Sequence, residues 1–91
     1  MIHYLKILPE YFEAVANGRK MYEVRKNDRP HPYAVGDTLV LKEWNDEVGE
    51  YTGRSVTVCV THILDDAKFV KHGYIIMGLS FRRPEEEEQQ C

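Results

Sequence analysis

The chain has 91 residues, of which 43% are hydrophobic and 30% are charged, and its formal net charge at pH 7 is −3. A chain of this length supports one small domain, and its apolar content exceeds that of disordered proteins. No apolar run approaches the roughly 20 residues of a membrane-spanning helix, and the N-terminus has no apolar stretch of signal-peptide length. We therefore expect a cytoplasmic domain with no membrane partner.

The negative charge is concentrated near the C-terminus. Four consecutive glutamates occupy positions 85–88, and without them 12 basic residues face 11 acidic residues. Runs of like charge without hydrophobic periodicity are usually solvated. We therefore expect residues 1–82 to form the domain and residues 83–91 to form an acidic, disordered tail, whose role the sequence leaves open.

The first predicted elements are a strand over residues 2–8 and a helix over residues 9–17. Pro9 suits the first turn of a helix, because its ring fixes φ near the helical value and its missing N–H would have no intrahelical partner there. Phe12 begins an apolar set with i, i+3, i+4 spacing, which shares one helical face. Gly18 suits the left-handed conformation that commonly ends a helix.

Four further strands are predicted after the helix, because β-branched and aromatic residues gather there between turn-rich segments. In the first of these four, alternation places Tyr22 and Val24 on one face and Glu23 and Arg25 on the other. Gly78, in the last, predicts a bulge or a close backbone approach. The four strands span residues 21–26, 38–44, 54–64 and 74–81.

Five strands and one early helix, without regular β–α alternation, argue against a doubly wound sheet. We predict a mainly β domain of the α+β class, with a small, partly closed, mixed β-barrel of about five strands and one N-terminal helix packed at its end. Closure would protect the edges of such short strands. Residues 45–53 are predicted to form a surface loop, residues 65–73 a polar segment with one helical turn, and Asp37 is predicted to cap its own turn.

Residues 18–29 hold five of the twelve Lys and Arg residues and form the most informative segment. Lys20 and Arg25 suit a phosphate, because lysine acts as a point charge and the arginine fork binds oxygens in pairs. Tyr22 offers a face on which a base can stack, an interaction of roughly 1–3 kcal/mol per base. Further aromatic side chains with this capacity are Tyr33, Trp44 and Tyr51.

The polar residues of the same segment suit a nucleobase edge. Glu23 can accept hydrogen bonds from exocyclic amines, and Asn27 can both donate and accept. The charges can equally form a salt-bridge ladder on a solvated strand face, and charge and spacing alone leave this alternative open.

Support for catalysis is thinner. Lys20 and Glu23 could serve as base and electrophile if neighbours shifted their pKa values. Thr52 is a candidate nucleophile, although a threonine in a turn is far more often structural. No Ser-His-Asp order, phosphate-binding loop or metal motif is present, and four scattered histidines with no Cys/His cluster predict neither a metal nor a cofactor.

The order of several motifs resembles that of the ASCH domain. Leu5-Lys6-Ile7 and Pro9-Glu10-Tyr11-Phe12 precede the signature Gly18-x-Lys20-x-x-Glu23-x-Arg25, and Gly36-Asp37 follows it before a strand. A more detailed similarity, to an uncharacterised bacterial and phage branch of that superfamily, rests on Arg25-Lys26-Asn27-Asp28-Arg29, Glu43-Trp44 and Tyr51-Thr52-Gly53-Arg54. The resemblance extends to about Phe81.

This resemblance implies a PUA-like β-barrel with a cleft between the barrel and the first helix, inferred in most ASCH domains to bind RNA or nucleotides. Lys20, Glu23 and Arg25 match the cleft signature, whereas Asn27 and Arg29 match the extension specific to the branch. We therefore expect RNA, a nucleotide or a modified nucleoside as the partner. The oligomeric state stays open between a monomer and a weak dimer.

Some small ASCH proteins are metal-independent amidohydrolases that deacetylate acetylcytidine. They use a lysine, a threonine three residues later and a downstream glutamate. Lys20 matches that lysine, but Glu23 stands where the threonine would be, so the proposed nucleophile is missing. The sequence therefore favours a binding module, and the alternative is an amidohydrolase acting on a modified nucleoside such as an acylated cytidine.

Overall fold

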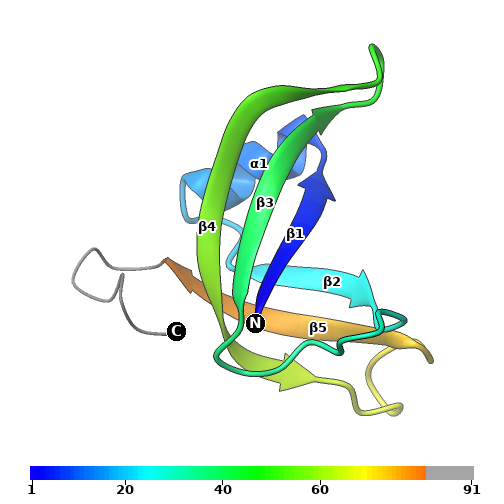
Figure 1. The fold of residues 1–91 in the computed structure, drawn as a ribbon. Coiled ribbons are helices and arrows are strands. Elements are labelled where there is room, and N and C mark those ends of the chain that lie inside the picture. Colours follow the sequence, from blue (N-terminus) through cyan, green and yellow to red (C-terminus); the bar gives the residue numbers. More distant parts are fainter. Residues whose placement is uncertain (82–91) are drawn as a thin grey trace.

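The computed structural model describes residues 1–81, which form five strands and one short helix (Figure 1). The predicted mainly β class, with five strands and an N-terminal helix, is confirmed. The predicted acidic tail, residues 83–91, lies outside the described residues. In chain order the elements are β1 (Ile2–Ile7), α1 (Pro9–Ala16), β2 (Tyr22–Lys26), β3 (Thr38–Asn45), β4 (Glu50–Leu64) and β5 (Tyr74–Phe81).

The strands form one mixed sheet in the order β1-β3-β4-β5-β2. β1 runs parallel to β3, and the other neighbours are antiparallel. The long strand β4 pairs with β3 along its first part and with β5 along its last part, so it belongs to both halves of the sheet. Figure 1 shows that β4 bends strongly and that β2 and β5 cross the direction of β1 and β3. The sheet is therefore a half-barrel whose two edges are β1 and β2.

A bulge in β4 contributes to this curvature. The pairing of β4 with β5 shifts register between Val60 and His62, so Thr61 is an extra residue opposite Gly78. A Cβ atom at position 78 would lie 3.1 Å from Thr61 Oγ1. Of the two alternatives predicted for Gly78, a bulge or a close backbone approach, the structure shows a bulge, whose extra residue lies in the partner strand β4 opposite this glycine. Bulges of this kind bend and twist the strand that carries them.

The core fills the concave side of the half-barrel and is covered by α1. Leu39, Leu41 and Val58 are fully buried in the sheet, and Phe12 and Val15 of α1 pack against it. The helix ends close to the predicted position, because Asn17 closes the last turn and Gly18 has a φ of +81°. This glycine lets the chain reverse directly into β2.

The arm formed by β3 and β4 is longer than predicted. β4 begins at Glu50 rather than at Arg54, so most of the predicted loop 45–53 is strand. Trp44 lies opposite Tyr51, and only a short turn ending at Gly49, with a φ of +72°, joins the strands. The polar sequence led to this error, because both strands of the projecting arm face solvent. The helical turn predicted within residues 65–73 is present as a single turn, because the Asp66 carbonyl accepts the Val70 N–H at 2.9 Å, and it does not continue into a helix.

Asp37 fastens the start of β1 to the turn before β3. Its Oδ2 accepts the Ala34 N–H at 3.0 Å, as the predicted turn cap requires, and lies 2.7 Å from His3 Nε2. Burial raises the pKa of Asp37, but hydrogen bonds from His3, Ala34 and the N-terminal ammonium outweigh burial, so this pKa lies below its ordinary value. The His3 ring lies 4.6 Å from that of Tyr33 in the core, so Tyr33 offers no free face to a ligand.

Candidate functional site

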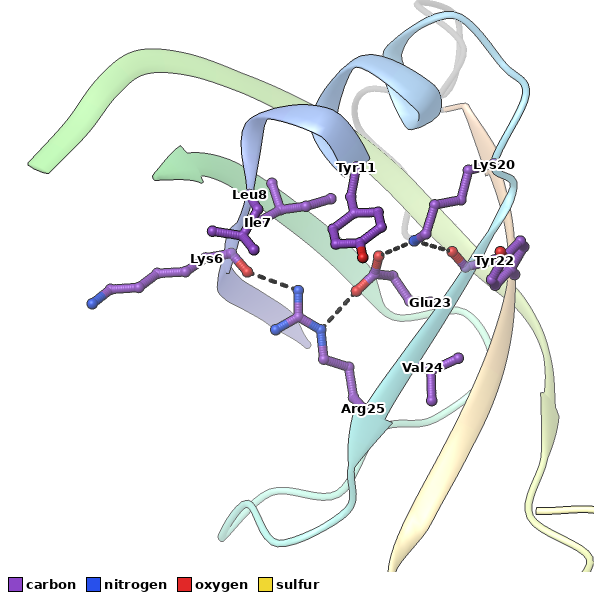
Figure 2. A pocket seen from close by; sticks show the side chains of 9 residues that line it. All are labelled: Lys6, Ile7, Leu8, Tyr11, Lys20, Tyr22, Glu23, Val24 and Arg25. Carbon is purple, nitrogen blue, oxygen red and sulfur yellow. Dashed lines mark hydrogen bonds and ion pairs between the residues drawn. The ribbon is translucent and has the colours of Figure 1, made fainter. Parts of the chain in front are cut away.

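A pocket of about 410 Å³ opens where the two sheet edges approach each other (Figure 2). We call it the seam pocket. Its walls come from the end of β1, the start of α1, and β2 with the segment before it. The lining residues are Lys6, Ile7, Leu8, Tyr11, Lys20, Tyr22, Glu23, Val24 and Arg25.

β2 buries Glu23 and half-buries Arg25, whereas its apolar residues Tyr22 and Val24 are exposed. Glu23 is only 3% exposed, whereas Tyr22 and Val24 are 49% and 50% exposed. The predicted alternation of the two faces is confirmed, but the charged face points inward. Burial of a carboxylate is unfavourable unless it is paired and hydrogen-bonded. Because Glu23 is buried, the charges around it differ from the solvated salt-bridge ladder that the sequence left open.

Glu23 is held between two cations. Lys20 Nζ lies 2.6 Å from Glu23 Oε1, and Arg25 Nε lies 2.6 Å from Oε2 (Figure 2). These are short, charge-assisted contacts, which are stronger than hydrogen bonds between neutral groups. Two positive charges thus surround one negative charge, and the centre of the pocket keeps an excess of one positive charge.

Arg25 also bridges the seam. Its Nη2 donates to the carbonyl oxygen of Lys6 in β1 at 2.8 Å. An edge strand presents backbone N–H and C=O groups that no neighbouring strand satisfies, and Arg25 satisfies one of them. The contacts described within residues 1–81 use two of the five N–H donors of the guanidinium. The remaining donors are available to a ligand.

Tyr11 forms the aromatic wall of the pocket. Its ring projects from the first half of α1 toward Glu23, beside Lys20 (Figure 2). The Lys20 ammonium lies 5.9 Å from the centroid of this ring and 4.8 Å from that of Tyr22. Lys20 also donates to the Tyr22 carbonyl at 2.8 Å, so Tyr22 meets the pocket with its backbone as well as its ring. A planar ligand can therefore lie against Tyr11 with the charged groups at its edge.

The chain matches a family described as "Domain of unknown function (DUF3850)" over residues 2–79. It belongs to this family. The match runs from β1 into β5, so both walls of the seam pocket lie inside the family's domain. The chain is also 44% identical over 64 residues to an "Uncharacterized 12.9 kDa protein in GpA 3'region" of Escherichia phage P2. That stretch is 70% of this chain and 55% of the phage protein, so the aligned part spans little more than half of the relative.

Not every predicted site residue of this family member reaches the pocket. The structure brings Lys20, Tyr22, Glu23 and Arg25 together there. Asn27, whose N–H bonds to the Gly73 carbonyl, does not line it. Arg29 also lies elsewhere, with its guanidinium 5.7 Å from the ring centroid of Tyr33. Both follow the end of β2, where the chain has left the seam.

Sequence reasoning missed Lys6 and Tyr11 as parts of the site. Lys6 contributes its carbonyl oxygen, which no side-chain pattern indicates. Tyr11 follows Pro9-Glu10 in the motif quoted for the ASCH resemblance, and that motif is the signal that the sequence offered for it. Lys6 lies in the opposite edge strand β1 and Tyr11 in the helix that follows it, so only the fold places them beside β2.

A second ionic cluster ties the arm to the helix. Arg54 contacts Glu43 through Nε at 2.9 Å and Nη2 at 2.8 Å, and its Nη2 also contacts Glu13 of α1 at 2.6 Å. The Thr52 hydroxyl donates to Glu43 Oε1 at 2.5 Å. Hydrogen bonds from Arg54 and then Thr52 lower the pKa of Glu43, and the two glutamates raise that of Arg54. Thr52 does not line the seam pocket, so its geometry fits a structural role.

No helix among residues 1–81 has the length and apolar character needed to cross a membrane. In the same part of the chain, no group of three or more His, Cys, Asp or Glu side chains is placed to hold a metal ion.

Proposed function

We propose that the seam pocket binds a nucleotide, either free or as one residue of an RNA strand. The observation that carries this proposal is the burial of Glu23 between Lys20 and Arg25 at the meeting point of two sheet edges. The arrangement holds two cations in fixed positions while leaving guanidinium donors for an anion. The resemblance of Gly18-x-Lys20-x-x-Glu23-x-Arg25 to the ASCH cleft signature supports the same ligand class.

The chemistry of the pocket suggests how such a ligand would lie. Its phosphate would meet Arg25 and Lys20, because these groups give the site its positive excess. Its base would stack on Tyr11, whose ring faces the pocket. A volume of about 410 Å³ falls within the range of small-molecule sites. The Lys6 backbone on the opposite wall would supply polar contacts to the base edge.

Hydrolysis of a modified nucleoside has less support. The lining contributed by the described residues contains no Ser, Thr or Cys side chain that could act as a nucleophile. Both Glu23 oxygens already accept a hydrogen bond from a cation, so in this arrangement the carboxylate serves to hold Lys20 and Arg25 in place. We therefore keep the amidohydrolase reaction as a possible outcome of the test, to be sought by incubating the protein with acylated cytidine.

The test compares two charge-removing variants on the same strand. Arg25→Gln removes a pocket cation, and Lys26→Gln removes the same charge from the next residue, which is exposed and does not line the pocket. Binding of uridine monophosphate is measured by calorimetry. Loss of a charged hydrogen bond, worth about 1.5–3 kcal/mol, predicts at least about tenfold weaker binding for Arg25→Gln. Lys26→Gln should stay within about twofold of the wild type.

Circular dichroism of both variants checks that the fold is retained. Equal affinities of the Arg25→Gln variant and the wild type, or equal losses in both variants, would exclude the seam pocket as the site. A further expectation is that affinity falls as salt concentration rises, because phosphate binding displaces counterions.

A further inference from the structure

A second polar and aromatic surface lies on the outer face of the sheet, on the side opposite the core. Alternation along β1 buries His3, Leu5 and Ile7 and turns Tyr4 and Lys6 outward, and Tyr4 is 63% exposed. Lys6 pairs in register with Lys42 of the neighbouring strand β3. Beyond them on the arm lie Trp44 and Tyr51. We call the surface formed by Tyr4, Lys6, Lys42, Trp44 and Tyr51 the outer track.

The two lysines of the outer track lie over two of its three aromatic rings. Lys6 Nζ is 3.8 Å from the centroid of Trp44, and Lys42 Nζ is 4.5 Å from that of Tyr51. The rings meet edge to face, with centroids 4.9 Å apart. Cations at these distances are attracted to the aromatic faces. The track is therefore an ordered array of rings and ammonium groups.

No carboxylate neutralises this array within the part of the chain that the structure describes, because neither lysine takes part in an ion pair there. Lys6 and Lys42 are in register on adjacent parallel strands, so two like charges lie close together on one face of the sheet and repel each other. A purely structural role would be served better by one opposite charge. Two neighbouring ammonium groups without an ion pair among the described residues suit an anionic partner.

Lys6 connects the outer track to the seam pocket. Its carbonyl oxygen accepts from Arg25 in the pocket, while its side chain extends away from the pocket (Figure 2). A ligand that leaves the pocket over β1 therefore meets Lys6 and then the Trp44 and Tyr51 rings. In Figure 1, β1 lies beside β3, and the arm of β3 and β4 continues past the end of β1.

We propose that the outer track binds a single-stranded nucleic acid, one nucleotide of which occupies the seam pocket. This inference rests on the proposed function and extends it from a nucleotide to an oligonucleotide. Tyr4 and Tyr51 are exposed and give stacking faces for bases, and the lysines neutralise the backbone between them. The carboxylates of Asp46, Glu47 and Glu50 at the tip of the arm would repel phosphates and so end the track.

The test separates the track from the pocket by ligand length. Affinities for uridine monophosphate and for a labelled hexauridine RNA are measured with the full chain, by calorimetry and fluorescence anisotropy respectively. A Lys42→Gln/Tyr51→Leu double variant changes the track without touching the pocket lining. Hexauridine should bind this variant about tenfold or more weakly, with a salt slope reduced by about 0.7, while monophosphate affinity stays unchanged. A Lys68→Gln/Lys71→Gln variant, with two exposed lysines outside both surfaces, should lose no more than about twofold.

Two other outcomes would overturn the track proposal, and they differ in what they say about the pocket. If the wild type binds the monophosphate but the double variant binds hexauridine unchanged, the track is wrong and the pocket proposal stands. If neither ligand binds the wild type, the proposed function fails and the track fails with it. Trp44→Leu serves as a second variant, because it removes the ring over which Lys6 lies and should also weaken the binding of hexauridine. A deoxyuridine hexamer of equal length determines whether the track distinguishes RNA from DNA.

Discussion

The replacement of Glu23 by glutamine is the sharpest test of how the site is held together. Glu23 is 3% exposed and receives one cation on each carboxylate oxygen, each at 2.6 Å. Glutamine has the same shape, but it keeps one acceptor and turns an N–H₂ group toward the other cation. The substitution therefore removes one charge-assisted hydrogen bond. It also places the amide N–H₂ donor of glutamine against the N–H donor of Lys20 or Arg25.

The expected loss of stability follows from these contacts. A hydrogen bond to a charged group contributes about 1.5–3 kcal/mol. The side chains of Lys20 and Arg25 are 15% and 25% exposed, so water can solvate part of the cation that is released. We therefore expect Glu23→Gln to lower the free energy of unfolding by about 2 kcal/mol. For a domain of this size, the melting temperature should fall by about 10 °C.

Urea denaturation followed by circular dichroism measures this loss, with Glu50→Gln as the matched control. Glu50 is exposed on the arm and has no ion pair among residues 1–81, so its variant should change the free energy of unfolding by less than about 0.5 kcal/mol. A loss in Glu23→Gln no larger than in this control would refute the view that a buried, charged carboxylate organises the pocket.

Three other perturbations test separate features of the fold. Gly18→Ala should lose about 1–2 kcal/mol in thermal unfolding, because its φ of +81° strains any residue with a Cβ atom; an unchanged melting temperature would contradict this conformation. Asp37→Asn should destabilise the protein at neutral pH. Since the pKa of Asp37 is lowered from 3.8 on folding, the stabilisation is present above that value and is lost as the pH falls through the folded-state pKa. The difference between wild type and variant should therefore shrink below about pH 4, and a constant difference would exclude the linkage. Arg54→Gln should raise the pKa of Glu43 toward its ordinary value in an NMR titration, because Arg54 is the main cause of its lowering; an unaltered titration would contradict the contact.

Features determined by neighbouring residues could be predicted from the sequence. Pro9 and Gly18 bracket α1, because the constraints on their φ angles act locally. Alternation along β2 separated Glu23 and Arg25 from their neighbours, since successive side chains of a strand point to opposite faces. Gly78 indicated the bulge in the same way. Periodicity does not say which face is buried, and here it is the charged one.

Features that depend on distant residues could not be predicted. The seam exists because the sheet order leaves β1 and β2 at its edges, and no local pattern encodes that order. The contact of Arg25 with Lys6 therefore appears only in the fold. The polar composition of residues 45–53 concealed the extension of β4, because its pairing with β3 depends on register. Asn27 and Arg29 were joined to the site by sequence proximity, although the end of β2 directs them elsewhere.

The most direct test of the central claim is a ¹H–¹⁵N NMR titration of the labelled protein with uridine monophosphate. If the seam pocket binds the nucleotide, the largest amide shifts should cluster at Lys6, Tyr11 and Glu23, which come from three elements but line one cavity. Amides of the turn around Asp66 should stay unshifted. Largest shifts in that turn, or the absence of shifts at saturating nucleotide, would contradict the account.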